Sequence, residues 1–112
     1  MDQNRMKPVP AANAQRIEQL KAISSDVRFQ ILAWLKSPSE HFPDQVTGEA
    51  DEIGVCVSLI AKKLNISQPT ASRHLDILKR ADLVYAERVQ TWSFYKRNEE
   101  GISRFRSWLS TI

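Results

Sequence analysis

The residues best suited to chemistry lie close together, between positions 67 and 80. They are hydrogen-bonding side chains that follow one another within two helical turns: Gln68, Thr70, Ser72 and Arg73. In the major groove of DNA, which is about 12 Å wide and admits a helix, a Gln side chain pairs well with adenine and an Arg side chain with guanine. Reading of base edges is therefore the chemistry that this set indicates, although any one of these residues alone would pass for an ordinary solvated residue.

A helix must present these side chains, and the sequence supplies its signals. Ser67 can cap the helix through the amide of Thr70, and Pro69 falls in the first turn, where its missing N–H costs nothing. Spacings of four and three place Ala71, Leu75 and Leu78 on the buried side. His74 lies at the edge of that stripe, so packing is its main expected role and DNA contact a minor one.

Two shorter patterns flank this helix. Residues 55–64 have apolar positions at helical spacing and are followed by a brief turn at 65–67, so the two helices form a helix-turn-helix. Residues 83–89 and 92–97 are rich in β-branched and aromatic side chains and predict a hairpin around Gln90 and Thr91. That pair lacks the Asn-Gly or Asp-Gly typical of a two-residue turn, which favours a wider one.

The other segments complete one small domain. Residues 1–12 predict a flexible tail, 13–23 an amphipathic helix, and 26–36 a core helix capped by Ser24 or Ser25. Residues 39–54 carry five acidic and no basic side chains, which predicts a long loop that is either functional or mobile. Asn98 caps a last helix, whose start Gly101 weakens slightly.

At this point a resemblance becomes visible. Residues 67–84, SQPTASRHLDILKRADLV, resemble the recognition helix and following turn of ArsR-family transcriptional repressors, and the similarity spans roughly residues 15 to 110. The resemblance implies a mainly α winged helix-turn-helix of about five helices with a two-stranded wing, formed by residues 13–112 with the acidic 39–54 loop inserted. It also implies a homodimer that binds double-stranded DNA at an inverted repeat.

The expected DNA contacts combine the helix with the wing. They are Ser67, Gln68, Pro69, Thr70, Ser72, Arg73, His74, Lys79, Arg88, Thr91 and Trp92. Trp92 could instead pack beneath the wing. Residues 55–97 hold 8 basic and 3 acidic side chains, and the candidate phosphate contacts among them are Lys62, Lys63, Lys79, Arg80, Arg88, Lys96 and Arg97.

The first and last helices also predict a dimer. Their apolar stripes consist of Ile17, Leu20, Ile102, Phe105, Trp108 and Leu109. A core this small cannot easily cover both stripes, so a second chain would bury them. The alternative is that both stripes pack within one monomer.

Metal sensing is common in the family but is not expected here. Where ArsR-like sensors have a Cys-Val-Cys-Asp motif, this chain has Cys56 followed by Ser58 and Leu59, and no His occurs from Gln90 onward. We therefore expect no metal and no cofactor. A site made of Cys56, His41 and Asp44, or a redox switch at Cys56, remains an alternative, although the neighbouring valines suggest that Cys56 is buried.

Length and composition limit the other classes. With 112 residues, one Cys and no long apolar run, we expect a single cytoplasmic domain without disulfide, signal peptide or membrane segment. No glycine-rich phosphate loop or nucleophile with a partner suggests an enzyme. The remaining rival is a winged helix used for protein interaction, which would not need a basic, Arg-bearing recognition face.

Overall fold

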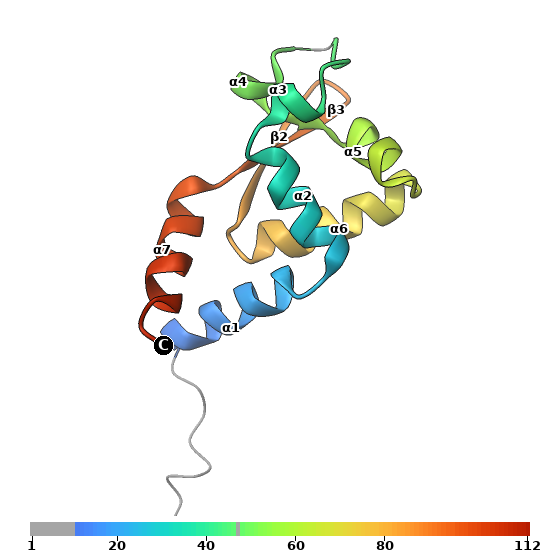
Figure 1. Cartoon of the computed structure of the whole chain (residues 1–112). Helices are drawn as coiled ribbons and strands as arrows, with labels where there is room; N and C mark the ends of the chain where they lie inside the picture. The colour runs from blue at the N-terminus through green and yellow to red at the C-terminus, as the bar shows by residue number, and fades with distance from the viewer. Residues whose placement is uncertain (1–10, 47) are drawn as a thin grey trace, which may run out of the picture.

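The computed structural model describes residues 11–46 and 48–112, which form seven helices and a three-stranded antiparallel sheet (Figure 1). In chain order the elements are α1 (Ala11–Ile23), α2 (Asp26–Leu35), α3 (Pro38–His41), α4 (Ala50–Ile53), β1 (Val55–Cys56), α5 (Val57–Leu64), α6 (Gln68–Arg80), β2 (Val84–Val89), β3 (Trp92–Arg97) and α7 (Glu99–Leu109). No helix within these ranges has the length and apolar character needed to cross a membrane. The mainly α class with a β-hairpin is confirmed, whereas α3, α4 and β1 are additional elements that we did not predict.

The first two helices differ slightly from the expected bounds. Ala11 and Ala12, which we assigned to the tail, already belong to α1, consistent with the high helix propensity of alanine. The other tail residues, 1–10, lie outside the described residues. Ser25 caps α2, because its side chain accepts a hydrogen bond from the backbone N–H of Arg28.

The sheet contains a strand that the sequence pattern hid. Val55 and Cys56 pair with Tyr95 and Phe94 of β3, so the strand order is β1-β3-β2 and α5 begins only at Val57. A two-residue strand carries no alternation from which to predict it, and its apolar residues merge with the helical pattern that follows.

The hairpin turn is tighter than expected. Val89 pairs with Trp92, which leaves Gln90 and Thr91 as a two-residue turn. Gln90 adopts the left-handed conformation, with φ 56°. The prediction of a wider turn is therefore wrong: a residue other than Gly, Asn or Asp occupies a position that those residues usually take.

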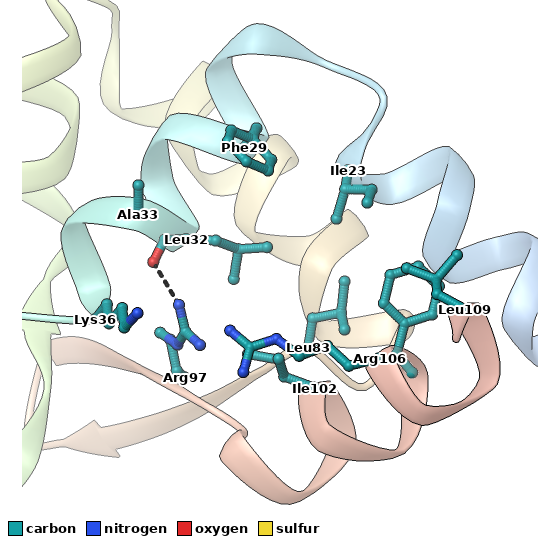
Figure 2. A pocket seen from close by; sticks show the side chains of 11 residues that line it. Ile23, Phe29, Leu32, Ala33, Lys36, Leu83, Arg97, Ile102, Arg106 and Leu109 are labelled. Atoms are coloured by element: carbon teal, nitrogen blue, oxygen red, sulfur yellow. Dashed lines mark hydrogen bonds between the residues drawn. The ribbon is translucent and has the colours of Figure 1, made fainter. Parts of the chain in front are cut away.

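Strand β3 is also fixed to α2. The Arg97 side chain donates a hydrogen bond from Nη1 to the backbone oxygen of Leu32 at 3.1 Å (Figure 2). The same guanidinium pairs with Glu99 at 2.9 Å. Only 8% of the Arg97 side chain is exposed, so this residue joins the wing, α2 and α7.

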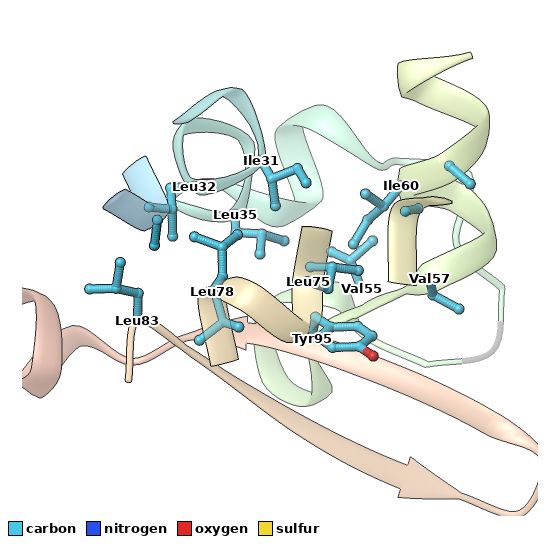
Figure 3. Close-up of a cluster of buried hydrophobic side chains, with 14 of the residues drawn as sticks. Ile31, Leu32, Leu35, Val55, Val57, Ile60, Leu75, Leu78, Leu83 and Tyr95 are labelled. Atoms are coloured by element: carbon cyan, nitrogen blue, oxygen red, sulfur yellow. The ribbon is translucent and has the colours of Figure 1, made fainter. Parts of the chain in front are cut away.

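The hydrophobic core lies where α2, α5 and α6 meet the sheet (Figure 3). Its largest fully buried apolar side chains come from four different elements and the turn after α6: Ile31, Val55, Ile60, Leu75, Leu78 and Leu83. The prediction that α2 is a core helix is confirmed by the burial of Ile31, Leu32 and Leu35. This core fixes the back of α6 and leaves its other face to solvent.

The acidic segment is folded rather than a plain loop. Phe42 is buried and packs edge-on against Trp34 at a centroid distance of 6.1 Å. The Gln45 amide donates to the backbone oxygens of Gly48 and Gly54 and accepts from the N–H of Cys56 at 2.8 Å. Because the Gln45 side chain and the Phe42 ring anchor the segment, it is ordered despite its polar composition.

Candidate nucleic-acid interface

Helices α5 and α6 meet at a tight turn. Asn65 ends α5 in the left-handed conformation, with φ 57°, which Asn tolerates well. Ser67 then starts α6 by accepting a hydrogen bond from the N–H of Thr70 at 3.2 Å. Both termini are thus capped within three residues, and the predicted helix-turn-helix is present. In Figure 1, α5 and the start of α6 lie on the side of the molecule opposite α7.

A chain of hydrogen bonds runs along the exposed face of α6. The Ser67 hydroxyl lies 2.8 Å from the Thr70 hydroxyl, and Arg73 donates to that same hydroxyl at 3.3 Å. Arg73 is exposed and forms no ion pair with any described residue. The Arg73 guanidinium is therefore oriented by its own helix while its remaining donors face solvent.

The predicted helix contacts are mostly accessible. Ser67, Gln68, Pro69, Arg73 and Lys79 are exposed, whereas Thr70, Ser72 and His74 are half-buried. The acidic segment, as far as it is described, leaves Gln68 and Arg73 uncovered, so it does not occlude this face in the conformation observed.

The predicted wing residues are exposed as well. Arg88, Thr91 and Trp92 all lie at the hairpin tip, and Trp92 is 43% exposed. With 43% of Trp92 exposed, its contact with DNA stays a prediction.

The candidate phosphate contacts divide into two groups. Lys62, Lys79, Arg80 and Arg88 are exposed and form no ion pair with any residue that the structure describes. Three others are engaged: Lys63 lies 5.1 Å above the Trp34 ring, Lys96 donates to the backbone oxygen of Glu52, and Arg97 is buried as described above. Arg97 is therefore a structural residue, because its guanidinium already donates three hydrogen bonds, two to Glu99 and one to the backbone oxygen of Leu32.

Two functional supports of α6 escaped the sequence reasoning. Gln15 and Gln19 of α1 both donate through Nε2 to the backbone oxygen of Ala81, at 3.1 and 3.0 Å. Ala81 caps the C-terminus of α6, where backbone oxygens lack helical partners. Gln19 is only 1% exposed, so a buried glutamine side chain holds the C-terminal end of the recognition helix.

Arg28 is the second support. Its Nε donates to the backbone oxygen of Ala22 at 2.6 Å, and its Nη1 lies 3.2 Å from Nδ1 of His74. A guanidinium can only donate, so Nδ1 of His74 accepts and the imidazole is neutral. His74 thereby ties the middle of α6 to α2, which agrees with the packing role predicted for it, and no sequence signal marked Arg28 as its partner.

This contact makes stability depend on pH. Burial, followed by the positive charges of Arg28 and Arg73, holds the pKa of His74 below its ordinary value of 6.5. The unfolded chain therefore binds a proton more readily than the folded one, and the stabilising effect of the neutral ring is present above about pH 6.5 and lost as the pH falls below it.

We expect wild-type protein to lose part of its unfolding free energy between pH 7.5 and pH 5, and His74→Gln to lose less over the same range. Chemical denaturation at a series of pH values measures both. His41→Gln is the control, since it makes the same replacement at the other histidine, and its slope is compared with that of His74→Gln. Equal slopes for wild type and His74→Gln would contradict the assignment.

Cys56 offers no open thiol. It is 4% exposed, and its Sγ lies 3.2 Å from Oγ of Ser58, the residue that stands where sensors have a second Cys. Among the residues that the structure describes, no three His, Cys, Asp or Glu side chains are grouped as metal ligands. Neither His41 nor Asp44 joins Cys56 in such a group.

The predicted dimer residues fall into two sets. Ile102 and Phe105 are buried inside the chain, at 7% and 4% exposure, so their side of α7 packs on the chain's own core. Ile17 is 38% exposed, and Leu20, Trp108 and Leu109 are half-buried. The polar Gln15 and Gln19 contact the end of α6 from α1, while Ile17 of the same helix is exposed and Leu20 is half-buried.

A capped helix-turn-helix with an exposed polar second helix, followed directly by a hairpin, defines a winged helix-turn-helix DNA-binding domain. The model of the arsR family of bacterial regulatory proteins matches residues 55–86, from β1 to the middle of β2. The uncharacterized HTH-type transcriptional regulator YbzH of Bacillus subtilis is 47% identical over 95 residues, which cover 85% of this chain and 95% of YbzH. The chain therefore belongs to the ArsR family of transcriptional regulators and is not an enzyme.

Other relatives agree with this assignment. The transcriptional repressor SdpR of Bacillus subtilis is 32% identical over 80% of this chain and 82% of its own length. A solution structure of the homodimeric winged helix-turn-helix domain of a possible ArsR-family regulator from Mycobacterium bovis is 26% identical, with a TM-score of 0.64. That match covers 99% of this chain and 84% of the other.

Proposed function

We propose that this regulator is a homodimeric repressor that occupies an inverted-repeat operator. The observation that carries the proposal is the exposed face of α6, where Thr70, itself hydrogen-bonded to Ser67, orients the exposed Arg73, and where Gln68 is also exposed. The start of α6 enters the major groove, Arg73 and Gln68 contact base edges, and the basic residues nearby contact phosphates. The wing tip, with Arg88 and Thr91, contacts the flanking backbone or minor groove.

Two further observations support the dimer and the repressor role. The apolar Ile17 of α1 is exposed and Leu20 is half-buried, and the related Mycobacterium bovis domain is homodimeric. The relative SdpR, which is 32% identical, is a transcriptional repressor. A dimer places two recognition helices about one DNA turn apart, which matches an inverted repeat.

Selection of bound DNA from a random pool, followed by titration of the selected sequence at several salt concentrations, tests the proposal. A palindromic sequence should emerge, and the logarithm of its affinity should fall linearly with the logarithm of the salt concentration. Enrichment of no sequence would contradict a specific operator. The absence of any salt-dependent binding would favour the protein-interaction alternative.

Arg73→Gln should lower affinity for the selected operator about tenfold and relax the base preference at one position in each half-site. Arg80→Gln, which removes the same charge from the same helix, should weaken binding to all sequences alike and reduce the salt slope by about 1. Repeating the selection with both variants separates these effects. If Arg73→Gln selects the wild-type sequence with an unchanged preference, Arg73 reads no base.

A further inference from the structure

A cavity of about 340 Å³ lies between α2 and α7, away from the exposed face of α6 (Figure 2). Its volume is at the lower end of the range that small-molecule sites occupy. The residues that line it include Phe29, Leu83, Phe105, Lys36, Arg97 and Arg106. They combine an apolar wall with three cations and no carboxylate.

The apolar wall joins buried and exposed side chains. Leu83 and Phe105 are almost completely buried and form part of the floor, while Phe29 is 61% exposed at the rim. An exposed Phe beside a cavity leaves apolar surface in water that a ligand's hydrocarbon body would cover.

The cations make the cavity selective for an anion. Arg97 is neutralised by Glu99, but Lys36 and Arg106 form no ion pair with any residue that the structure describes. In Figure 2 the side chains of Lys36, Arg97 and Arg106 gather at one end of the cavity, whereas Phe29, Ile23 and Leu109 lie toward the other. A ligand with an anionic head and an apolar body therefore matches both ends.

We propose that this cavity binds an amphipathic monoanion, such as a medium-chain carboxylate, with its head between Lys36 and Arg106 and its chain against Phe29 and Phe105. Of the accessible residues proposed for the dimer, Leu109 lines the cavity, whereas Ile17, Leu20 and Trp108 do not, so the ligand would share one residue with that surface.

Calorimetric titration of the full chain with decanoate, below the concentration at which it forms micelles, tests the site. We expect saturable binding of one decanoate per chain, and much weaker binding of decan-1-ol, which has the same chain without the charge. The variant Lys36→Gln/Arg106→Gln should bind decanoate at least about tenfold more weakly, because a charge-assisted hydrogen bond is worth that factor or more. Equal binding of decanoate and decan-1-ol would overturn the proposal that the site recognises an anionic head group.

The control variant is Lys21→Gln/Arg104→Gln, which removes the same two charges from positions outside the cavity, one of them also on α7. It should bind decanoate within twofold of wild type. Ala33→Trp should abolish binding, because Ala33 lines the cavity and a Trp side chain there would fill it. Circular dichroism checks that each variant is folded.

Two results would overturn the inference: no saturable binding to the wild-type chain, or equal binding to the Lys36→Gln/Arg106→Gln variant and its control. A groove covered by a second copy of the chain would give the first result. Because decanoate binding is measured without DNA, a failure of operator binding leaves this inference in place.

Discussion

Replacing Gly101 by Ala should lower the free energy of unfolding by about 3 kcal/mol, the upper end of what overpacking at a rigid site costs. Alanine is normally the better helix former, by about 1 kcal/mol. Here a Cβ would lie 2.2 Å from the backbone oxygen of Asp82 and 2.8 Å from Nδ2 of Asn98. Because one of these atoms belongs to the backbone, the clash cannot be relieved by turning a side chain, and its cost exceeds the gain in propensity.

The surroundings of Gly101 explain why the junction cannot move. Asp82 holds the left-handed conformation, with φ 64°, in the turn between α6 and β2. Asn98 is 3% exposed and donates to the backbone oxygen of Asp82 at 3.1 Å, while it accepts from the N–H of Gly101 at 3.0 Å. Asn98 thus joins the turn after α6 to the start of α7. The space that remains beside it accommodates only a glycine at position 101.

Urea denaturation of Gly101→Ala and of the wild type measures the loss. Ser103→Ala is the matched control, because Ser103 is exposed on the same helix and should change stability by less than about 0.5 kcal/mol. A Gly101→Ala variant as stable as wild type would show that the turn at Asp82 adjusts freely. From the sequence alone we expected Gly101 to weaken the start of the helix slightly, so that alanine there would stabilise it. The structure reverses the expected sign of this change in stability.

The recognition helix could be predicted in detail because its determinants are local. Ser67, Pro69 and the spacing of Ala71 and Leu75 lie within nine residues, and each acts on the helix to which it belongs. The start of α7 at Asn98 followed from the same kind of local signal, since its side chain accepts from the N–H of Gly101. Helix caps and hydrophobic periodicity were therefore enough to predict the fold class and most of the candidate site.

The missed features depend on contacts between distant residues. Gln19 and Ala81 are 62 positions apart, Arg28 and His74 are 46, and no short pattern marks either pair. Gln19 is instructive, because a polar residue on an amphipathic helix is normally placed toward solvent, whereas here it satisfies the end of a neighbouring helix. The same packing leaves Ile17 of α1 exposed, and the sequence alone does not say which way an apolar stripe faces.

The exposed Ile17 leads to the prediction with the largest expected effect on function. Ile17→Glu should convert the proposed dimer to a monomer and lower operator affinity by about 100-fold or more. In a dimer, binding of one protomer raises the effective concentration of the other at the second half-site, and a monomer lacks this advantage. Ile17 is 38% exposed and contributes little to the chain's own core, so the variant should stay folded. Light scattering gives the mass, circular dichroism the fold, and titration of the selected operator the affinity.

Gln30→Glu is the control, because it adds the same negative charge at an exposed position of α2. It should remain dimeric and lose affinity only through weak, salt-sensitive repulsion. A dimeric Ile17→Glu with wild-type affinity would place the interface elsewhere, and a monomeric variant with unchanged affinity would show that one chain recognises the operator alone. Ile102 and Phe105 are already buried within the chain, so in the proposed dimer Trp108 and Leu109 would be the apolar residues of α7 that meet the partner.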